Sequence, residues 1–403
     1  MIFIFIFIFI FIFIFSSFCF KKNVTYLFPL FFSFIFLYTY LGANYFEYAY
    51  DIPFADQMAY EINLNGVGLA YLTAIFGFIF GIELAKKNYV WGSSKRQKIV
   101  TKNSSFLDNF HMEINKKYIY SSFFVSLILV IFTFNVEQLI YRNGYIIENV
   151  NKFLILYKLS LILAIFLIAY IEKKVIRNFC FFVLLIVPFS LNSRIFSLCI
   201  FLFYFGLYIK NGFKLNLKSK IIFIFLLLFS FLTSLGFRSN EMQGLIPNIM
   251  ALSQLGSYFD IFFKSFNYVS SFSVFASQYA IDYGYSDMKA FYISINPLPS
   301  SFLDIDYIYN TAWLNAYAPT PAIAMSYNAG PLFCFIYYFL CGFIFTYIFK
   351  KMNFGLFYSF MVCLFVYYVF LNTQYIIREG TRLFYYFILL YFLYKFYLSF
   401  NKP

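Results

Sequence analysis

RSNEMQGLIP at residues 238–247 opens a long polar interval, and YAPTPAIAMS at residues 317–326 closes it. Charged residues recur through this interval among prolines and glycines: Arg238, Glu241, Asp260, Lys264, Asp282, Asp287, Asp304 and Asp306. The interval is too long for a turn between two membrane helices, and it is too rich in aromatic residues to be disordered. We therefore expect a folded loop over residues 237–326, on one face of a membrane.

The sequence on either side of this loop is almost entirely apolar. Of the 403 residues, 63% are hydrophobic, 26% are aromatic and only 12% are charged, whereas soluble domains carry roughly 25% charged residues. Apolar runs of about 20 residues are typical of transmembrane helices, because backbone groups in lipid must be hydrogen-bonded within the structure. The composition predicts an all-α polytopic membrane protein, with residues 1–403 forming a single transmembrane domain.

The apolar runs predict about 11 transmembrane helices. They lie at about 2–20, 24–42, 64–85, 118–140, 153–171, 178–192, 195–209, 220–236, 327–349, 354–372 and 383–400. Residues 2–15 alternate Ile and Phe, but no polar face results, so in lipid we expect a helix there. Small residues in the run at 64–85 predict close helix packing: Gly66, Gly68, Gly77 and Gly81.

The lysines predict the topology. They concentrate in alternate loops, above all in residues 86–117, and basic loops remain in the cytoplasm. Counting outward from a basic cytoplasmic loop at 86–117 places the C-terminus in the cytoplasm and the loop at 237–326 on the outer face. The net charge of +13 therefore sets topology and does not indicate a nucleic-acid partner.

The outer face holds arginines where the inner face prefers lysines. They are Arg142, Arg194, Arg238, Arg378 and Arg382. Guanidinium grips phosphate with two parallel hydrogen bonds, and Arg378 and Arg382 share a face if their segment is helical. We interpret Arg194, Arg238, Arg378 and Arg382 as ligands of a lipid diphosphate. The alternative is structural pairing with Glu241, Glu379 or lipid headgroups, and it is the preferred interpretation for Arg142.

Other chemistries find little support in the sequence. The one histidine, His111, lies in the basic cytoplasmic region, so no outer catalytic triad or histidine metal site is expected. The six cysteines lack metal-ligand spacing, and no phosphate-binding glycine motif is present. Asp304 and Asp306 form a DxD pattern, which we interpret as structural or sugar-binding because nucleotide-sugar donors are cytoplasmic. We expect no metal and no cofactor.

Several segments resemble the O-antigen polymerase family, Wzy, whose members polymerise oligosaccharide repeat units. They are SR at 193–194, GFRS at 236–239, INPLP at 295–299, PTPA at 319–322 and SYNAG at 326–330. The resemblance extends to the overall pattern of spans and a late outer loop. It implies a GT-C-like, ligase-related glycosyltransferase of the bacterial inner membrane, with its active site facing the periplasm.

The resemblance also implies the reaction and its partners. A growing chain on undecaprenyl diphosphate would be transferred to a lipid-linked repeat unit, and undecaprenyl diphosphate would leave. Arg194 and Arg238 match the family's outer arginines, while Arg378 and Arg382 are added from their position. Asp304, Asp306 and Glu241 are candidate bases for the acceptor hydroxyl. A separate chain-length regulator is an expected partner, besides the lipid-linked donor and acceptor and the bilayer.

Four other functions stay open from the sequence. A lipid-linked oligosaccharide flippase would need charged residues along its spans and repeated halves, and neither is evident. An O-antigen ligase would carry an outer histidine, which is missing, whereas another polyprenyl-phosphate-sugar glycosyltransferase fits the acidic residues Asp51 and Asp56 of the first outer segment. A scaffold protein would not need the outer arginines.

Overall fold

The computed structural model describes residues 2–20, 23–42, 64–92, 115–144, 151–212, 214–237, 240–254, 258–315, 318–352 and 356–400. The chain divides into two units. Unit 1 comprises residues 1–106, 267–353 and 364–403, and unit 2 comprises residues 107–266 and 354–363. Arg238, Asp51, Asp56, His111 and most of the predicted basic loop at 86–117 lie outside the described residues.

Unit 1 consists of long apolar helices and a group of short elements. The long helices are α1 (Ile2–Phe20), α2 (Leu27–Leu41, preceded by the 3₁₀ turn η1, Val24–Tyr26), α4 (Asn65–Gly92), α16 (Pro331–Lys351) and α18 (Ile377–Phe400), with the later part of α17 (Leu356–Gln374) and of α12 (Tyr258–Asp282). The short elements are α13 (Met288–Ile295), η5 (Ser300–Phe302), α14 (Ile305–Thr311), β3 (Trp313–Asn315), β4 (Ala318–Pro319) and α15 (Ala322–Asn328).

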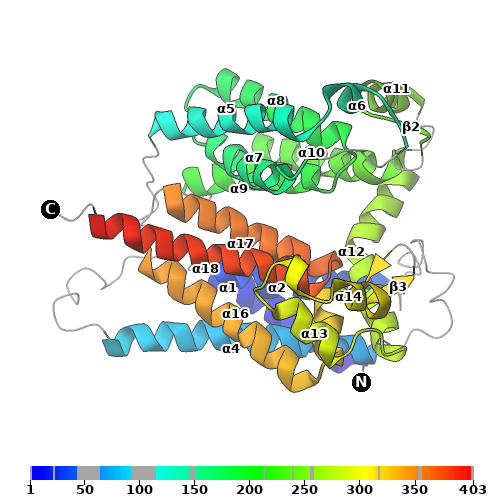
Figure 1. Cartoon of the computed structure of the whole chain (residues 1–403), viewed down its shortest axis with the longest axis vertical. Helices are drawn as coiled ribbons and strands as arrows, with labels where there is room; N and C mark the ends of the chain where they lie inside the picture. Colours follow the sequence, from blue (N-terminus) through cyan, green and yellow to red (C-terminus); the bar gives the residue numbers. More distant parts are fainter. Residues whose placement is uncertain are drawn as a thin grey trace. The chain divides into compact units, whose positions relative to one another are not determined.

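Helices α4 and α16 lie side by side and run in the same direction (Figure 1). A Cβ atom added at Gly81 would collide with the carbonyl oxygen of Phe339, and one at Gly342 would collide with that of Phe78. A Cβ at Gly77 would lie 2.5 Å from the carbonyl oxygen of Phe335. Only glycine allows the two backbones to approach so closely. This confirms the prediction from the sequence that Gly77 and Gly81 permit close packing.

The later half of α12 packs against α2 and α4 through buried polar groups. Tyr38 donates to the side chain of Asn267, and Thr39 Oγ1 lies 3.3 Å from the carbonyl oxygen of Ser270. The Tyr71 and Ser273 hydroxyls are 2.7 Å apart. Such bonds satisfy polar side chains between apolar helices. The interval predicted to be an outer loop therefore contains a helix that belongs to the bundle.

The short elements of unit 1 form what we call the cap, the described residues of 283–330. Its small core includes Leu314, Ala318 and Ala324, packed with Phe272 and Ala276 of α12. The hairpin of β3 and β4 is antiparallel, and the backbone N–H of Ser286 donates to Thr311 O at 2.8 Å. The segment predicted to be a folded loop is thus ordered by its own hydrogen bonds and by α12.

Unit 2 contains α5 (Lys116–Thr133), α6 (Val136–Ile140), α7 (Leu154–Ile168), α8 (Lys174–Ser190), α9 (Ile195–Lys210), α10 (Leu217–Gly236) and α11 (Leu245–Gln254). The two-residue strands β1 (Arg142–Asn143) and β2 (Met242–Gln243) pair in antiparallel fashion. At Gly244 the backbone φ is 118°, and a Cβ would lie 2.6 Å from Ile140 O. Glycine at this position therefore lets the chain leave β2 and enter α11.

Each of the predicted apolar runs overlaps a helix, so the all-α membrane class is confirmed. Among the described residues, six helices are long and apolar enough to cross a bilayer. They are Val24–Leu41, Asn65–Lys87, Lys116–Thr133, Pro331–Lys351, Leu356–Thr373 and Ile377–Phe400, while Ile4–Phe20, Leu154–Ile168 and Ile195–Lys210 are shorter apolar helices.

Candidate functional site

Arg378 joins α18 to the cap. Its side chain is only 3% exposed. Nη1 donates to Ile293 O at 2.9 Å, and Nη2 donates to Leu298 O at 3.2 Å. The planar guanidinium suits this task because its donors point in fixed directions toward both carbonyls. Arg378 therefore holds the chain between α13 and η5 against the first turn of α18.

Arg382 lies one turn further along the same face of α18 and is more accessible. Its Nη2 donates to the Ser300 hydroxyl, and its Nη1 lies 3.5 Å from a carboxylate oxygen of Glu379. The side chains of Arg382 and Glu379 are 37% and 43% exposed. An ion pair this exposed contributes little to stability, and the partial exposure of Arg382 lets an anion in solution reach its guanidinium.

A network of side chains, which we call the clip, joins α13 to α14. Asp287 caps α13 by accepting from Ala290 N at 2.8 Å, and its other oxygen accepts from the Tyr307 hydroxyl at 2.5 Å. Asp304 caps α14 by accepting from Tyr307 N at 3.2 Å. Lys289 Nζ lies 3.8 Å from Asp304 Oδ2 and 3.8 Å from the centre of the Tyr307 ring.

The clip shifts the pKa of both groups that share its central hydrogen bond. Burial acts to raise the pKa of Asp287, but the hydrogen bonds from Tyr307 and from backbone amides outweigh it and lower the pKa. The same bond to Asp287 raises the pKa of Tyr307, since the neutral hydroxyl is the form that donates. The two groups therefore stabilise each other as a carboxylate and a protonated phenol.

The carboxylates predicted as bases occupy different environments. Asp304 is committed to capping α14 and to Lys289, although it is exposed. Asp306 lies in the first turn of α14 with an exposed side chain. Glu241 belongs to unit 2 and is exposed, and its backbone oxygen accepts from Gly144 N at 2.8 Å.

Arg194 lies in unit 2, at the tight reversal between α8 and α9. Asn192 makes that reversal with a backbone φ of 48°, and it is buried in a cluster of amides. Its Nδ2 donates to Gln243 Oε1 and, at 3.2 Å, to Asn248 Oδ1. Asn248 Nδ2 donates back to Asn192 Oδ1 at 2.9 Å. The amide cluster fixes the backbone from which the half-buried Arg194 projects.

The surroundings of Arg142 fit a structural role, which is the interpretation that we preferred from the sequence. It is 5% exposed, and Nη1 donates to Ser190 O at 3.0 Å.

Of the other predicted residues, unit 1 brings Arg378, Arg382, Asp304 and Asp306 to the cap, whereas Arg194 and Glu241 belong to unit 2. The sequence did not single out Asp287, Lys289, Tyr307 or Ser300 as site residues. An aspartate just before a helical segment is a capping signal that pointed to Asp287.

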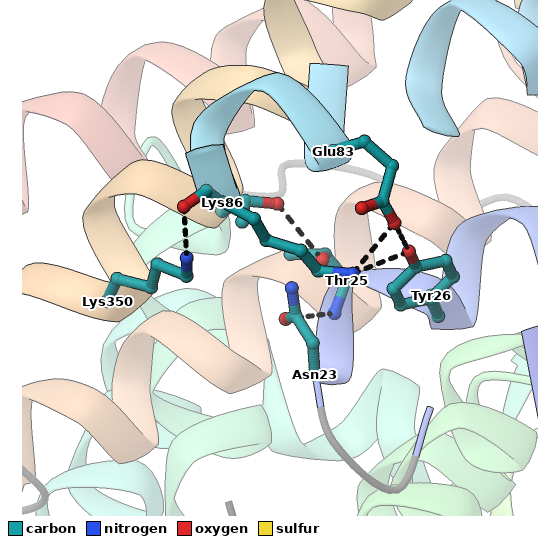
Figure 2. A network of polar contacts seen from close by, with 7 residues as sticks. Asn23, Thr25, Tyr26, Glu83, Lys86 and Lys350 are labelled. Atoms are coloured by element: carbon teal, nitrogen blue, oxygen red, sulfur yellow. Dashed lines mark hydrogen bonds and ion pairs between the residues drawn. The ribbon is translucent and has the colours of Figure 1, made fainter. Parts of the chain in front are cut away.

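A second polar network lies at the other end of α4 and α16 (Figure 2). Tyr26 donates to Glu83, and Lys86 Nζ lies 2.8 Å from Glu83 Oε1 and 2.7 Å from the Tyr26 hydroxyl. Lys350 Nζ donates to Lys86 O at 3.4 Å. The ends of three helices that were predicted to share one membrane face thus meet at one end of the bundle, roughly 30 Å from the cap along α16.

Metal ligands are not grouped in the described part of the chain, where no cluster of three His, Cys, Asp or Glu side chains is present. The cysteines Cys180, Cys199, Cys334, Cys341 and Cys363 are buried and free, and Cys19 is half-buried and free. No family model matches this chain, and no curated protein or solved structure is significantly similar to it. The function of this protein must therefore be inferred from the chemistry of these residues.

Proposed function

We propose that this protein is a membrane-embedded glycosyltransferase, an O-antigen polymerase that joins oligosaccharide repeat units carried on undecaprenyl diphosphate. The observation that carries the proposal is Arg382, an accessible guanidinium at the edge of a folded polar cap. It lies near the N-terminal end of α18, where the helix dipole adds positive potential for an anion. A bacterial lipid diphosphate is the anionic donor that fits a site at the end of a membrane bundle.

In the proposed reaction, a hydroxyl oxygen of the acceptor repeat unit attacks the anomeric carbon of the donor chain. The bond from that carbon to the diphosphate oxygen breaks, and undecaprenyl diphosphate leaves with the electron pair. The hydroxyl proton passes to a carboxylate. Arginines stabilise the charge that develops on the leaving diphosphate. No nucleotide or metal enters this scheme, since the donor is already activated.

The candidate groups differ in their fitness for these roles. Arg378 donates to cap carbonyls, so it acts as a positioning residue for Arg382 and Ser300. Arg194 and Arg238 remain proposed diphosphate ligands. Among the candidate bases Asp304, Asp306 and Glu241, the first is committed to its helix cap, which favours the other two.

The proposed enzyme has a defined place and orientation in the membrane. The protein would cross the bacterial inner membrane about 11 times in a GT-C-like arrangement, with the cap facing the periplasm. The lysines at the far end of α4 and α16 would then face the cytoplasm, as the distribution of basic residues requires. A chain-length regulator would be a natural partner of such an enzyme.

The test compares lipopolysaccharide ladders from a strain lacking the gene and complemented with defined variants. We expect core with a single repeat unit from the deletion strain and from the R382A strain, at unchanged protein level. Lys395→Ala is the matched control, an exposed cation on the same helix, and it should restore the full ladder. An unchanged ladder in the deletion strain would refute the polymerase, and core without any repeat would indicate a flippase or a ligase.

A further inference from the structure

One face of α14, continued by Trp313, carries polar and aromatic side chains together. Asp306, Tyr309 and Asn310 are exposed and have the spacing of neighbours on a helix surface. The Tyr309 ring stacks on that of Trp313, with centroids 5.7 Å apart and planes 29° apart. Tyr309 is 54% exposed. Its stacked ring therefore offers an aromatic surface to the solvent, beside a carboxylate and an amide.

The polar groups of this face have hydrogen-bonding capacity to spare. Within the part of the chain that the structure describes, the side chains of Asp306 and Asn310 make no hydrogen bond or ion pair. Trp313 Nε1 is buried and also lacks a partner there. Asp306 and Asn310 therefore keep donors and acceptors that a ligand can use in place of water, beside the exposed Tyr309 ring.

The clip makes α14 a rigid support for this face. Asp304 caps the helix, and Tyr307 of the same helix is held by Asp287 and by Lys289. Thr320 N also donates to Ala312 O at 2.7 Å, which joins the hairpin to the end of α14. A surface that is already ordered loses little entropy when a ligand binds.

We propose that this face binds a saccharide, with a sugar ring on Tyr309 and its hydroxyls on Asp306 and Asn310. A sugar has an apolar C–H face for an aromatic ring, whose face is electron-rich, and hydroxyls at its rim that both donate and accept. A carboxylate that only accepts, next to an amide that does both, matches such hydroxyls. The inference rests on the proposed function for its ligand, which would be the oligosaccharide of the acceptor repeat unit.

Trp313 provides the readout for a test. The chain contains two tryptophans, so Trp91→Phe leaves Trp313 as the one indole fluorophore in the full-length protein. The probe is the oligosaccharide released by mild acid from the surface polysaccharide of the source bacterium. We expect a saturable change in Trp313 emission and, in the Y309A protein, a dissociation constant about threefold to tenfold higher. Asn310→Ala should weaken binding in the same direction.

Tyr283→Ala is the matched control. Tyr283 is an exposed cap tyrosine as well, but its ring contacts that of Tyr279 and it lies outside α14. Equal weakening by Y283A and Y309A, or no saturable change in emission, would overturn the saccharide site. The lipid surface is the competing occupant: in nanodiscs containing brominated phospholipid, quenching of Trp313 would show that this face meets the bilayer, and would also overturn it.

The polymerase and the saccharide site can be refuted independently of each other. Saturable, Tyr309-dependent binding together with an unchanged ladder in the deletion strain would remove the polymerase and keep the saccharide site. Loss of the ladder without binding at Tyr309 would remove the saccharide site and keep the polymerase.

Discussion

Nη1 of Arg378 donates a 2.9 Å hydrogen bond to the carbonyl oxygen of Ile293, 85 residues earlier in the chain. This bond and the one to Leu298 tie the cap to the first turn of α18. Arg378→Ala removes the donor from two partly buried hydrogen bonds, at a cost of about 1–3 kcal/mol. We expect faster amide hydrogen exchange over residues 293–303. Arg378→Lys should not restore protection from exchange, since an ammonium lacks the fixed pair of donors of a guanidinium. Arg382→Ala should leave this protection intact.

The clip should weaken at both extremes of pH. The lowered pKa of Asp287 gives stability that is present above the unfolded pKa of about 3.9 and lost as the pH falls through the folded value. The raised pKa of Tyr307 gives stability that is present below about 10 and lost as the pH rises through its folded value.

The emission of Trp313 in the Trp91→Phe protein reports on this dependence, because Trp313 stacks on α14. We expect transitions on the acid side of about pH 4 and on the alkaline side of about pH 10. Tyr307→Phe should abolish the contribution of this residue on the alkaline side. An alkaline transition of unchanged size in that variant would contradict the role of the hydroxyl.

A side chain at Gly81 should disrupt the packing of α4 on α16. Its Cβ would meet the backbone of Phe339, which cannot rotate away as a side chain can. We expect Gly81→Val to cost about 1–3 kcal/mol, the usual penalty of overpacking, measured as a lower melting temperature in detergent. Gly66→Ala is the control, because its nearest neighbour is the Gln278 side chain at 3.3 Å. Equal melting temperatures for the two variants would show that α4 and α16 are further apart.

Removing Glu83 should separate the helix ends at the second polar network. Tyr26 and Lys86 both bond to this carboxylate, and Tyr26 is fully buried. We expect Glu83→Ala to cost about 1–3 kcal/mol, because the Tyr26 hydroxyl is left without an acceptor and Lys86 loses its ion pair. Glu83→Ala combined with Tyr26→Phe should cost less than the sum of the single changes, by thermal unfolding. Strict additivity would contradict the bond.

The amide cluster of unit 2 should depend on Asn192 in two ways. Its φ of 48° is a conformation that asparagine tolerates better than alanine. Its amide also partners Gln243 and Asn248. Asn192→Gly relieves the backbone but loses the bonds, so we expect it to destabilise by about 1–3 kcal/mol, and Asn192→Ala should destabilise further. If both variants melt alike, backbone strain does not contribute.

The start of α18 shows where prediction from the sequence stopped short. The span was expected to begin at about residue 383, because Arg378, Glu379 and Arg382 make the preceding turns polar. The helix begins at Ile377 instead. Carbonyl oxygens of the cap and the Ser300 hydroxyl accept from the two arginines, and these partners lie too far away in the sequence to be counted in a hydropathy window.

The serine-rich face of α12 was hidden for a similar reason. Polar residues such as Asn267, Ser270 and Ser273 lower its hydropathy, so residues 258–282 read as part of an outer loop. In the bundle these residues meet Tyr38, Thr39 and Tyr71. Polar residues at a helix interface cost little free energy when neighbouring helices supply their hydrogen-bond partners. Those partners are known only once the helices are packed.

The sequence by itself determined the membrane class, the apolar helices and the alternation of basic loops, because burial in lipid depends on residue type and run length alone. It also predicted the close helix contact at Gly77 and Gly81, but not the one at Gly342. Tertiary structure alone decided that Arg378 is a buried anchor while Arg382 stays accessible, and that Asp287 accepts from the hydroxyl of Tyr307, 20 residues further along the chain. Those assignments depend on hydrogen-bond partners and burial, which chain folding brings together across large separations in sequence.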